Sequence, residues 1–388
     1  MPPSPETERR LGEIRGNVPA RAPSVRALAA FSQNTGCRLA ALGFAAGVDF
    51  DRLLTGTRFR PSFGQSPFAI QRGLSFERGL RTDGHAAALE LLRAPLGLAP
   101  GTGAVVNLRD GFPSGPGRSA ARAAATLAEL RRVVGRAPGA PHLIDGAVLA
   151  GTVGGCTAHF EADMLTAREP DGLIRVAEVK SFPKVDDRVD PEQLGAALDQ
   201  IAVYVLLARD AVRAAGADPE LVSDRGLLIT PHNVGLTPTL SEACVGPRVV
   251  RIRRVLAALP DADEVVAATP AGVSFGPIAD TGAEEARRLD ALHQIADTVG
   301  TAYAPNCLTT CGSARFCRAR AVAAGAPCVT GPAAVRLLPE VLDLGRAESL
   351  TRGAPPTPQE APAAALLASA GRLIDEAVPA PLPTRRTA

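Results

Sequence analysis

The order in which hydrophobic periodicity changes between residues 142 and 230 constrains the fold of this chain more than any other feature. Strand-like runs come first, and we expect three of them, at residues 142–150, 159–168 and 173–182. A long amphipathic helix is expected next, over residues 191–215, followed by one more short buried strand at 226–230. Strands that alternate with a long helix in this way predict a mixed α/β core, in which helices flank a sheet.

The composition is that of a globular protein. The 388 residues include 46% hydrophobic side chains, which is enough to bury one full core and allows two. A net charge of +2, from 42 basic and 40 acidic residues, excludes a polyanion-binding tail but leaves room for a local basic groove. The chain shows no secretory signal and no run of the roughly 20 apolar residues that would span a membrane. We therefore expect a cytoplasmic protein with no membrane partner.

The pattern divides the chain into five expected segments. These are a flexible, Pro-rich arm at 1–24, a helical segment at 25–65, the α/β core at 66–300, a cysteine-containing segment at 301–350, and a linker, helix and disordered tail at 351–388. Besides the helix over 191–215, we expect helices at 76–92, 120–134, 248–259, 284–299 and 363–377.

A carboxylate and a lysine share one face of the third predicted strand. Glu178 and Lys180 lie two residues apart, and a hairpin can bring Asp163 of the preceding strand beside Glu178. Two clustered carboxylates favour a hard divalent cation such as Mg²⁺. Lys180 beside such a cation can orient or help to deprotonate a water that attacks phosphorus, which is phosphodiester hydrolysis. The alternative is a cross-strand salt bridge on a solvated face of the sheet.

Other polar residues extend this pattern on both sides. Gln200 and Tyr204 lie four residues apart on the long predicted helix, and Gly73 precedes Glu77 by the same spacing. In the order Gly-x-x-x-Glu, Asp, Glu-Val-Lys and Gln-x-x-x-Tyr, residues 73–209 resemble the PD-(D/E)XK nuclease superfamily, and within it the RecB-type nuclease domains. The resemblance implies a restriction-endonuclease-like core sheet flanked by helices, which makes segment 66–300 a RecB-like nuclease core.

The same resemblance implies a role for each residue of the pattern. It implies ligands of Mg²⁺ or Mn²⁺ at Asp163, Glu178 and Glu77, a catalytic lysine at Lys180, and a motif that contacts DNA or supports the site at Gln200 and Tyr204. Related iron-sulfur exonucleases usually carry His at the position of Glu77. His85, eight residues further on, can substitute for it or be an ordinary surface histidine. His159 and Glu161 alternate with Asp163 and can line the cleft, or form a plain polar strand face, so neither is included among the ligands.

Three cysteines, Cys307, Cys311 and Cys317, lie within eleven residues. Thiolate sets of this kind select Zn²⁺ or an iron-sulfur cluster, and a fourth ligand is missing locally. Distance along the chain alone favours Cys328 as that ligand. Iron-sulfur RecB-type nucleases, which include AddB nuclease domains and CRISPR-adaptation exonucleases, carry one cysteine before the core and three after it. The resemblance therefore implies a 4Fe-4S cluster held by Cys37 and the three later cysteines. A Zn²⁺ site with a His or Asp ligand, or three unligated buried thiols, are the alternatives.

Together these patterns predict a metal-dependent DNA nuclease with a structural 4Fe-4S cluster, acting as an exonuclease or on DNA ends or single strands. The alternatives are a catalytically idle DNA-binding or scaffold protein of the same fold, and a zinc-stapled interaction module. DNA is the expected partner. The sequence has no G-x-x-x-x-G-K-[ST] loop, so any unwinding must come from a helicase or another DNA-processing or defence protein. Arginines at 248–254 and 315–320 can contact phosphates, or form solvated helix faces.

Overall fold

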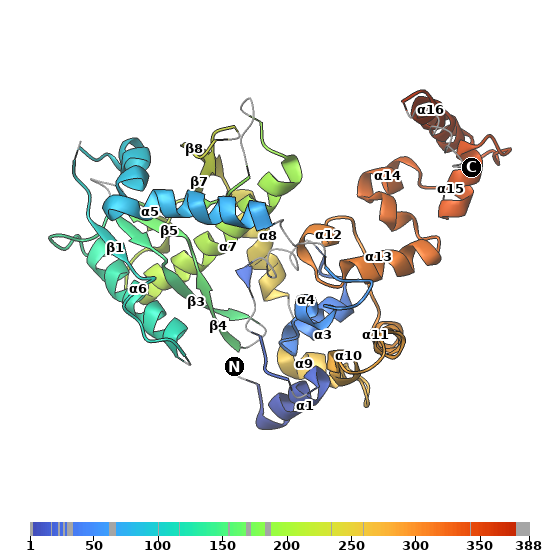
Figure 1. Cartoon of the computed structure of the whole chain (residues 1–388), viewed down its shortest axis with the longest axis horizontal. Coiled ribbons are helices and arrows are strands. Elements are labelled where there is room, and N and C mark those ends of the chain that lie inside the picture. The colour runs from blue at the N-terminus through green and yellow to red at the C-terminus, as the bar shows by residue number, and fades with distance from the viewer. Residues whose placement is uncertain are drawn as a thin grey trace, which may run out of the picture.

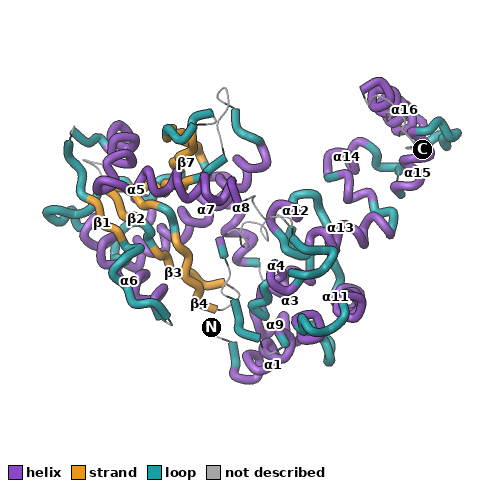
Figure 2. The backbone as a smooth tube through the Cα atoms, in the orientation of Figure 1, coloured by secondary structure: helices purple, strands orange, loops and turns teal. Residues whose placement is uncertain are grey.

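The chain forms two lobes, with a helical hairpin extending from the second one (Figure 1). One lobe is built around a sheet and the other is helical, as the backbone tube shows (Figure 2). The fold is therefore mixed α/β, as predicted. The structure is a computed structural model, and it describes residues 3–16, 18–21, 24–25, 28, 34–61, 67–99, 101–115, 117–153, 156–167, 172–182, 188–233, 235–258, 260–341 and 343–377.

Six strands form one mixed sheet in the order β1-β2-β5-β6-β7-β8. Their bounds are Val105–Asn107 for β1, Leu143–Asp145 for β2, Met164–Ala167 for β5, Ile174–Val179 for β6, Arg225–Pro231 for β7 and Pro238–Cys244 for β8. The pairs β1/β2 and β6/β7 are parallel, and the other neighbouring pairs are antiparallel. Helix α7 (Pro191–Ala214) connects β6 to β7, which is the crossover that a parallel pair of strands requires.

Helices cover both faces of this sheet. Helix α7 and helix α6 (Arg118–Val134) share one core with the strand residues Val176 and Leu228. Helix α5 (Pro67–Leu96) covers the opposite face, where Ala177 of β6 belongs to a second core. All six residues of β6 are buried, so the strand that carries the predicted Glu178 lies at the centre of the lobe.

Two of the predicted strands are each divided in the structure. Gly146, in the left-handed conformation (φ 68°), separates β2 from β3 (Val148–Val153), and residues 162–163 separate β4 (Cys156–Glu161) from β5. Strands β3 and β4 pair with each other as a separate antiparallel sheet. Asp163 therefore lies just before β5, and Glu161 belongs to a different strand and sheet, so the expectation that both share one strand face is wrong.

The predicted helices are present, and one of them is kinked. Helices α6, α7, α8 (Gly246–Ala257), α11 (Glu285–Val299) and α16 (Ala361–Ala377) begin and end within a few residues of the predicted bounds. Helix α5 contains the predicted 76–92 segment, but residues 82–85 leave helical geometry, with positive φ at Asp83 and His85. This kink changes the direction in which His85 points. Strands β1 and β8 were not predicted, since β1 has three residues and β8 is only partly buried.

The second lobe differs from the predicted division of the chain. The sequence predicts a flexible arm over residues 1–24, whereas α1 (Pro5–Arg15) is a helix capped by Ser4 and packed through Leu11 and Ile14. Its core also contains α3 (Arg38–Ala45), α4 (Phe50–Leu53), α9 (Ala262–Ala267), α10 (Gly276–Ala279) and α11. Residues 262–299 therefore pack with the N-terminal helices, and not with the sheet as the boundary at 300 predicts. Two apolar residues among many charges were too weak a pattern to reveal α1.

The chain ends in short helices. They are α12 (Cys307–Thr310), α13 (Ala314–Ala323), the 3-10 helix η2 (Pro327–Thr330), α14 (Pro332–Leu337) and α15 (Leu344–Thr351), followed by the longer α16. A further 3-10 helix, η1 (Pro219–Leu221), lies between α7 and β7. Helices α15 and α16 pack together around Leu350 and Ala363. The predicted disordered tail falls on residues 378–388, which lie outside the described residues. Within the described part of the chain, no helix has both the length and the apolar character needed to cross a membrane.

Candidate active site and cysteine cavity

Three acidic residues and one lysine of the predicted set come together where β5 begins and β6 ends. The register of these strands pairs Met164 with Ala177, so the next step places Asp163 opposite Glu178. The backbone N–H of Val179 donates to Asp163 Oδ2 at 2.9 Å. Glu77 reaches the same place from α5, near enough for its charge to raise the pKa of both other acids. The hairpin geometry predicted from spacing is therefore the observed one.

Glu178 is an unusual carboxylate because it is almost fully buried, at 4% exposure. Burial raises its pKa to about 7, against the opposing effect of Lys180, and the charge of Asp163 adds to the rise. Burial also raises the pKa of Asp163, although the hydrogen bond from Val179 lowers it. Glu178 Oε2 is buried and has no hydrogen-bond partner in the described structure. An ionised Glu178 therefore lacks compensation on one of its two oxygens.

Lys180 lies between a carboxylate and an amide. Its Nζ donates to Glu178 Oε1 at 2.7 Å and to Gln200 Oε1 at 2.6 Å. Its backbone N–H donates to Ile229 O at 2.9 Å, which continues the pairing of β6 with β7. Tyr204, one turn after Gln200 on α7, is buried and donates its hydroxyl proton to Glu161 O. The Gln-x-x-x-Tyr pair therefore positions Lys180 and the end of β4, and its tyrosine is not exposed for direct contact with a nucleic acid.

Gly73, the glycine of the Gly-x-x-x-Glu pattern, lies where a larger side chain would be crowded. A Cβ at Gly73 would lie 3.3 Å from Ser181 Oγ, directly after Lys180. The absence of a side chain lets α5 approach the end of β6 closely, which brings Glu77 one turn later toward the other acids.

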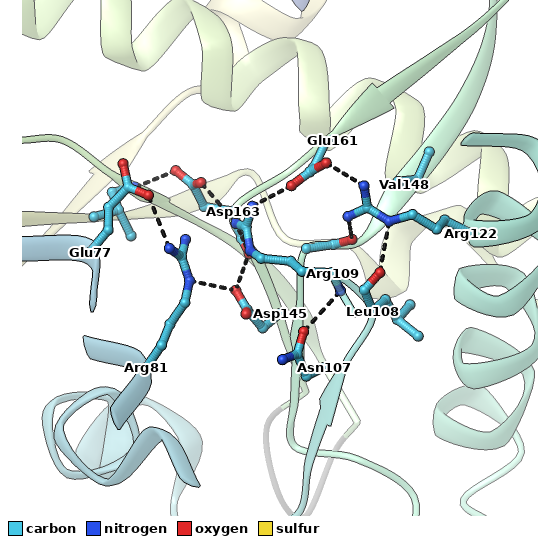
Figure 3. A network of polar contacts seen from close by, with 12 residues as sticks. Glu77, Arg81, Asn107, Leu108, Arg109, Arg122, Asp145, Val148, Glu161 and Asp163 are labelled. Carbon is cyan, nitrogen blue, oxygen red and sulfur yellow. Dashed lines mark hydrogen bonds and ion pairs between the residues drawn. The ribbon is translucent and has the colours of Figure 1, made fainter. Parts of the chain in front are cut away.

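Sequence reasoning missed a buried acid and two arginines beside this site (Figure 3). Asp145, the last residue of β2, is fully buried and accepts from Arg109 Nε at 3.1 Å and from Arg81 Nε at 3.4 Å. Arg109 Nη2 continues to Asp163 Oδ1 at 3.2 Å, and Arg81 Nη1 to Glu77 Oε2 at 3.0 Å. The sequence signal for Asp145 was an acid that directly follows the apolar residues Leu143 and Ile144. Functional carboxylates are often placed in this way, at the end of a buried strand.

His85 is neither a surface histidine nor a substitute for Glu77, because it is buried against Asp145. His85 is 5% exposed, so it is not a surface histidine. Its Nε2 lies 3.2 Å from Asp145 Oδ2, and it faces that acid because of the kink in α5. Glu161 is paired with Arg109 and Arg122. His85 is therefore not positioned to replace Glu77, and Glu161 is held in ion pairs with two arginines.

The cysteines surround a cavity of about 170 Å³ in the second lobe, where the N-terminal helices meet α12 and α13. Cys37, Cys307, Cys311 and Cys317 all line it, whereas Cys328 does not. The N-terminal segment is held there by a hydrogen bond from Leu39 N to the carbonyl oxygen of residue 300 at 3.1 Å. The four thiols predicted from the family pattern are thus the four that share one cavity.

Two of these thiols, those of Cys311 and Cys317, are poorly suited to ionise unaided. Burial raises the pKa of Cys317 to about 12, and nearby Cys311 and Cys37 add to the rise. Burial also raises the pKa of Cys311, while Ser313 opposes the effect. Bringing four thiolates together here therefore requires a positive group among them.

Both donor sets fit the groups that the sequence predicts by chemical type: buried oxygens for a hard cation, and four thiols for a soft one. Among the described residues, no three His, Cys, Asp or Glu side chains are already gathered at metal-binding spacing. Binding at either place would therefore draw side chains inward.

Comparison of the chain with protein-family models, curated proteins and solved structures found no significant match. Function is therefore inferred from this chain's own residues and their geometry.

Proposed function

We propose that this chain is a metal-dependent DNA nuclease of the PD-(D/E)XK type that hydrolyses phosphodiester bonds. The observation that carries the proposal is the buried Glu178 carboxylate, which lies opposite Asp163 and accepts from Lys180 through Oε1, while its Oε2 has no partner among the described residues. Leaving half of a buried carboxylate uncompensated costs free energy unless a cation binds there. A hard cation with carboxylate ligands is the partner that this oxygen fits best.

Each residue of the site has a separate task in this proposal. Asp163 and Glu178, with Glu77 on a third side, would hold Mg²⁺ or Mn²⁺, which supplies Lewis acidity and an activated water when bound. Lys180, fixed between Glu178 and Gln200, would orient that water and hold or move its proton. Gln200 thereby acts as a positioning residue.

The cysteine cavity supports a structural role for a 4Fe-4S cluster held by Cys37, Cys307, Cys311 and Cys317. Such a group would join the N-terminal helices to the C-terminal segment and close a very long loop of chain. Four cysteines in one cavity are also compatible with Zn²⁺, and metal analysis separates the two.

The test uses full-length protein purified anaerobically. End-labelled linear DNA and closed circular DNA are incubated with Mn²⁺, Mg²⁺ or a chelator, and the products are sized. We expect cleavage that needs a divalent ion, and its loss in Lys180→Ala but not in the matched variant Arg213→Gln, whose arginine lies on the exposed end of α7. DNA binding without any cleavage would favour an idle scaffold protein. A colourless protein that contains zinc and ignores DNA would favour the interaction module.

A further inference from the structure

Arg109 bridges three acids at the edge of the candidate site (Figure 3). Its Nε donates to Asp145 Oδ1 at 3.1 Å, its Nη2 to Asp163 Oδ1 at 3.2 Å, and its Nη1 to Glu161. Asp145 is fully buried, whereas the Arg109 side chain is 24% exposed. One edge of the guanidinium is therefore fixed in the interior, and its two terminal nitrogens face the site.

The backbone around Arg109 is also held in place. Arg118 Nη2 donates to Arg109 O at 2.6 Å, and Arg122 Nε donates to Leu108 O at 2.7 Å. Gly146 has no side chain, and a Cβ there would collide with Arg109 Cγ. Two further arginines thus fix this loop, and Gly146 leaves room for the aliphatic part of the Arg109 side chain. An ordinary surface salt bridge does not need so many supporting contacts.

The other cations of the site already have a task. Lys180 donates to Glu178 and Gln200, and Arg81 is held between Glu77 and Asp145. All three cations donate to an acid that the proposed function assigns to a metal ion. Arg81, however, keeps its Nη2 buried, whereas both terminal nitrogens of Arg109 contact the partly exposed acids Glu161 and Asp163. A metal ion and Arg109 would compete for the negative charge of Asp163, so metal binding would free a terminal nitrogen of Arg109 for another anion.

We propose that Arg109 is a catalytic residue whose two terminal nitrogens bind the scissile phosphate, and that Asp145 is the positioning residue that holds its Nε. This inference rests on the proposed function. In the DNA-free protein, these two nitrogens donate to one oxygen of Glu161 and one oxygen of Asp163. Two non-bridging phosphate oxygens would accept from them in the same way. A guanidinium fork matches that pair of oxygens, and its fixed charge stabilises the charge that develops on phosphorus oxygens in the transition state.

The test compares Arg109→Gln, Arg109→Lys and the matched control Arg213→Gln. With Mn²⁺ and saturating DNA, we expect the single-turnover rate of Arg109→Gln to fall about 10²- to 10³-fold, as removal of one transition-state donor does elsewhere. Arg109→Lys should recover part of the rate because it keeps the charge without the fork. Mn²⁺ affinity, measured by calorimetry without DNA, should not fall in Arg109→Gln, since a competing cation is removed. A purely structural arginine would instead lower Mn²⁺ affinity and the melting temperature together.

Asp145 is tested through its dependence on Arg109. We expect Asp145→Asn alone to slow cleavage about 10- to 100-fold, as loss of an outer-shell partner does. In Arg109→Gln the buried acid Asp145 loses a partner, which destabilises that variant. The double variant Arg109→Gln/Asp145→Asn also removes this acid, and it should cut hardly more slowly than Arg109→Gln.

Three outcomes overturn the inference, and they are distinguishable. If wild type cuts and Arg109→Gln cuts at the same rate, Arg109 has no catalytic role while the nuclease proposal stands. If Arg109→Gln loses Mn²⁺ affinity, and Arg109→Lys recovers none of the cleavage rate, the arginine is structural. If wild type cuts nothing with either metal ion, the proposed function fails and this inference fails with it.

Discussion

Replacing Glu178 with Gln should flatten the pH dependence of stability in the metal-free protein. Glu178 is buried, its Oε1 accepts from Lys180, and its Oε2 has no partner in the described structure. Glutamine keeps the shape and offers an oxygen to Lys180, but it cannot ionise. The substitution therefore isolates the cost of placing one negative charge in the interior without a metal ion.

The magnitude follows from the difference between the folded and unfolded pKa values. Burial raises the pKa of Glu178 from its ordinary 4.5 to about 7, so the folded protein holds this proton more tightly than the unfolded chain. The stabilisation that protonated Glu178 gives to the folded protein is complete below about pH 4.5 and is lost as the pH rises through about 7. The difference corresponds to about 3 kcal/mol. At pH 8 we expect Glu178→Gln to be more stable than wild type by an amount of this order, and at pH 4, below the unfolded value of 4.5, nearly equal to it.

The assay is equilibrium urea unfolding with a chelator, followed by circular dichroism at several pH values between these limits. Glu90→Gln is the control, because Glu90 is an exposed glutamate on α5 paired only with Arg93 among the described residues. Saturating Mn²⁺ at pH 8 should stabilise wild type and leave Glu178→Gln almost unchanged, since binding to the folded state alone raises stability. Parallel pH curves for wild type and Glu178→Gln would refute the argument that this carboxylate is buried and uncompensated.

Three further predictions concern the cysteines, the lysine and the arginine-rich helix. Cys37→Ser should remove the iron and the brown absorbance of anaerobically purified protein, whereas Cys328→Ser should keep both, because Cys37 lines the cavity with the other three thiols and Cys328 does not. Iron analysis showing the reverse would exchange the two assignments. Lys180→Ala should bind DNA normally in fluorescence anisotropy and stop cleavage, and cleavage near the wild-type rate would remove Lys180 from the mechanism. Arg253 and Arg254 are exposed on α8, which contains four arginines and no acid. Replacing either with Gln should reduce the salt dependence of DNA binding by about one ion without slowing single-turnover cleavage, and an unchanged salt slope would exclude this helix from the DNA path.

The acids and lysine of the site were predictable because local rules determine their placement. Alternation along β6 places Glu178 and Lys180 on one face, and the pairing of β5 with β6 fixes Asp163 opposite them. Gln200 was conspicuous as a polar residue on an apolar helix, and it contacts Lys180. Each of these inferences needs only a period of two or four residues and one hairpin.

The second set of residues could not be found by such rules. Asp145 contacts Arg109 and Arg81 across gaps of 36 and 64 residues, which no local pattern encodes. His85 was placed on the face of Glu77 by helical spacing, but positive φ values at residues 83–85 turn it toward Asp145. A non-glycine residue in that conformation is held by its surroundings, so tertiary contacts override the helical pattern here.

The choice between Cys37 and Cys328 shows why distance along the chain is a poor guide to a ligand set. Cys328 follows Cys317 closely in sequence, yet its helix η2 lies outside the cavity. Cys37 directly precedes α3, and α1 and α3 share a core with α9, α10 and α11. Burial of these helices already brings the N-terminal segment to the residues around Cys307, and the entropy of closing a loop grows only with the logarithm of its length. Packing of apolar helix faces, which the charged α1 sequence conceals, therefore decides which cysteine joins the set.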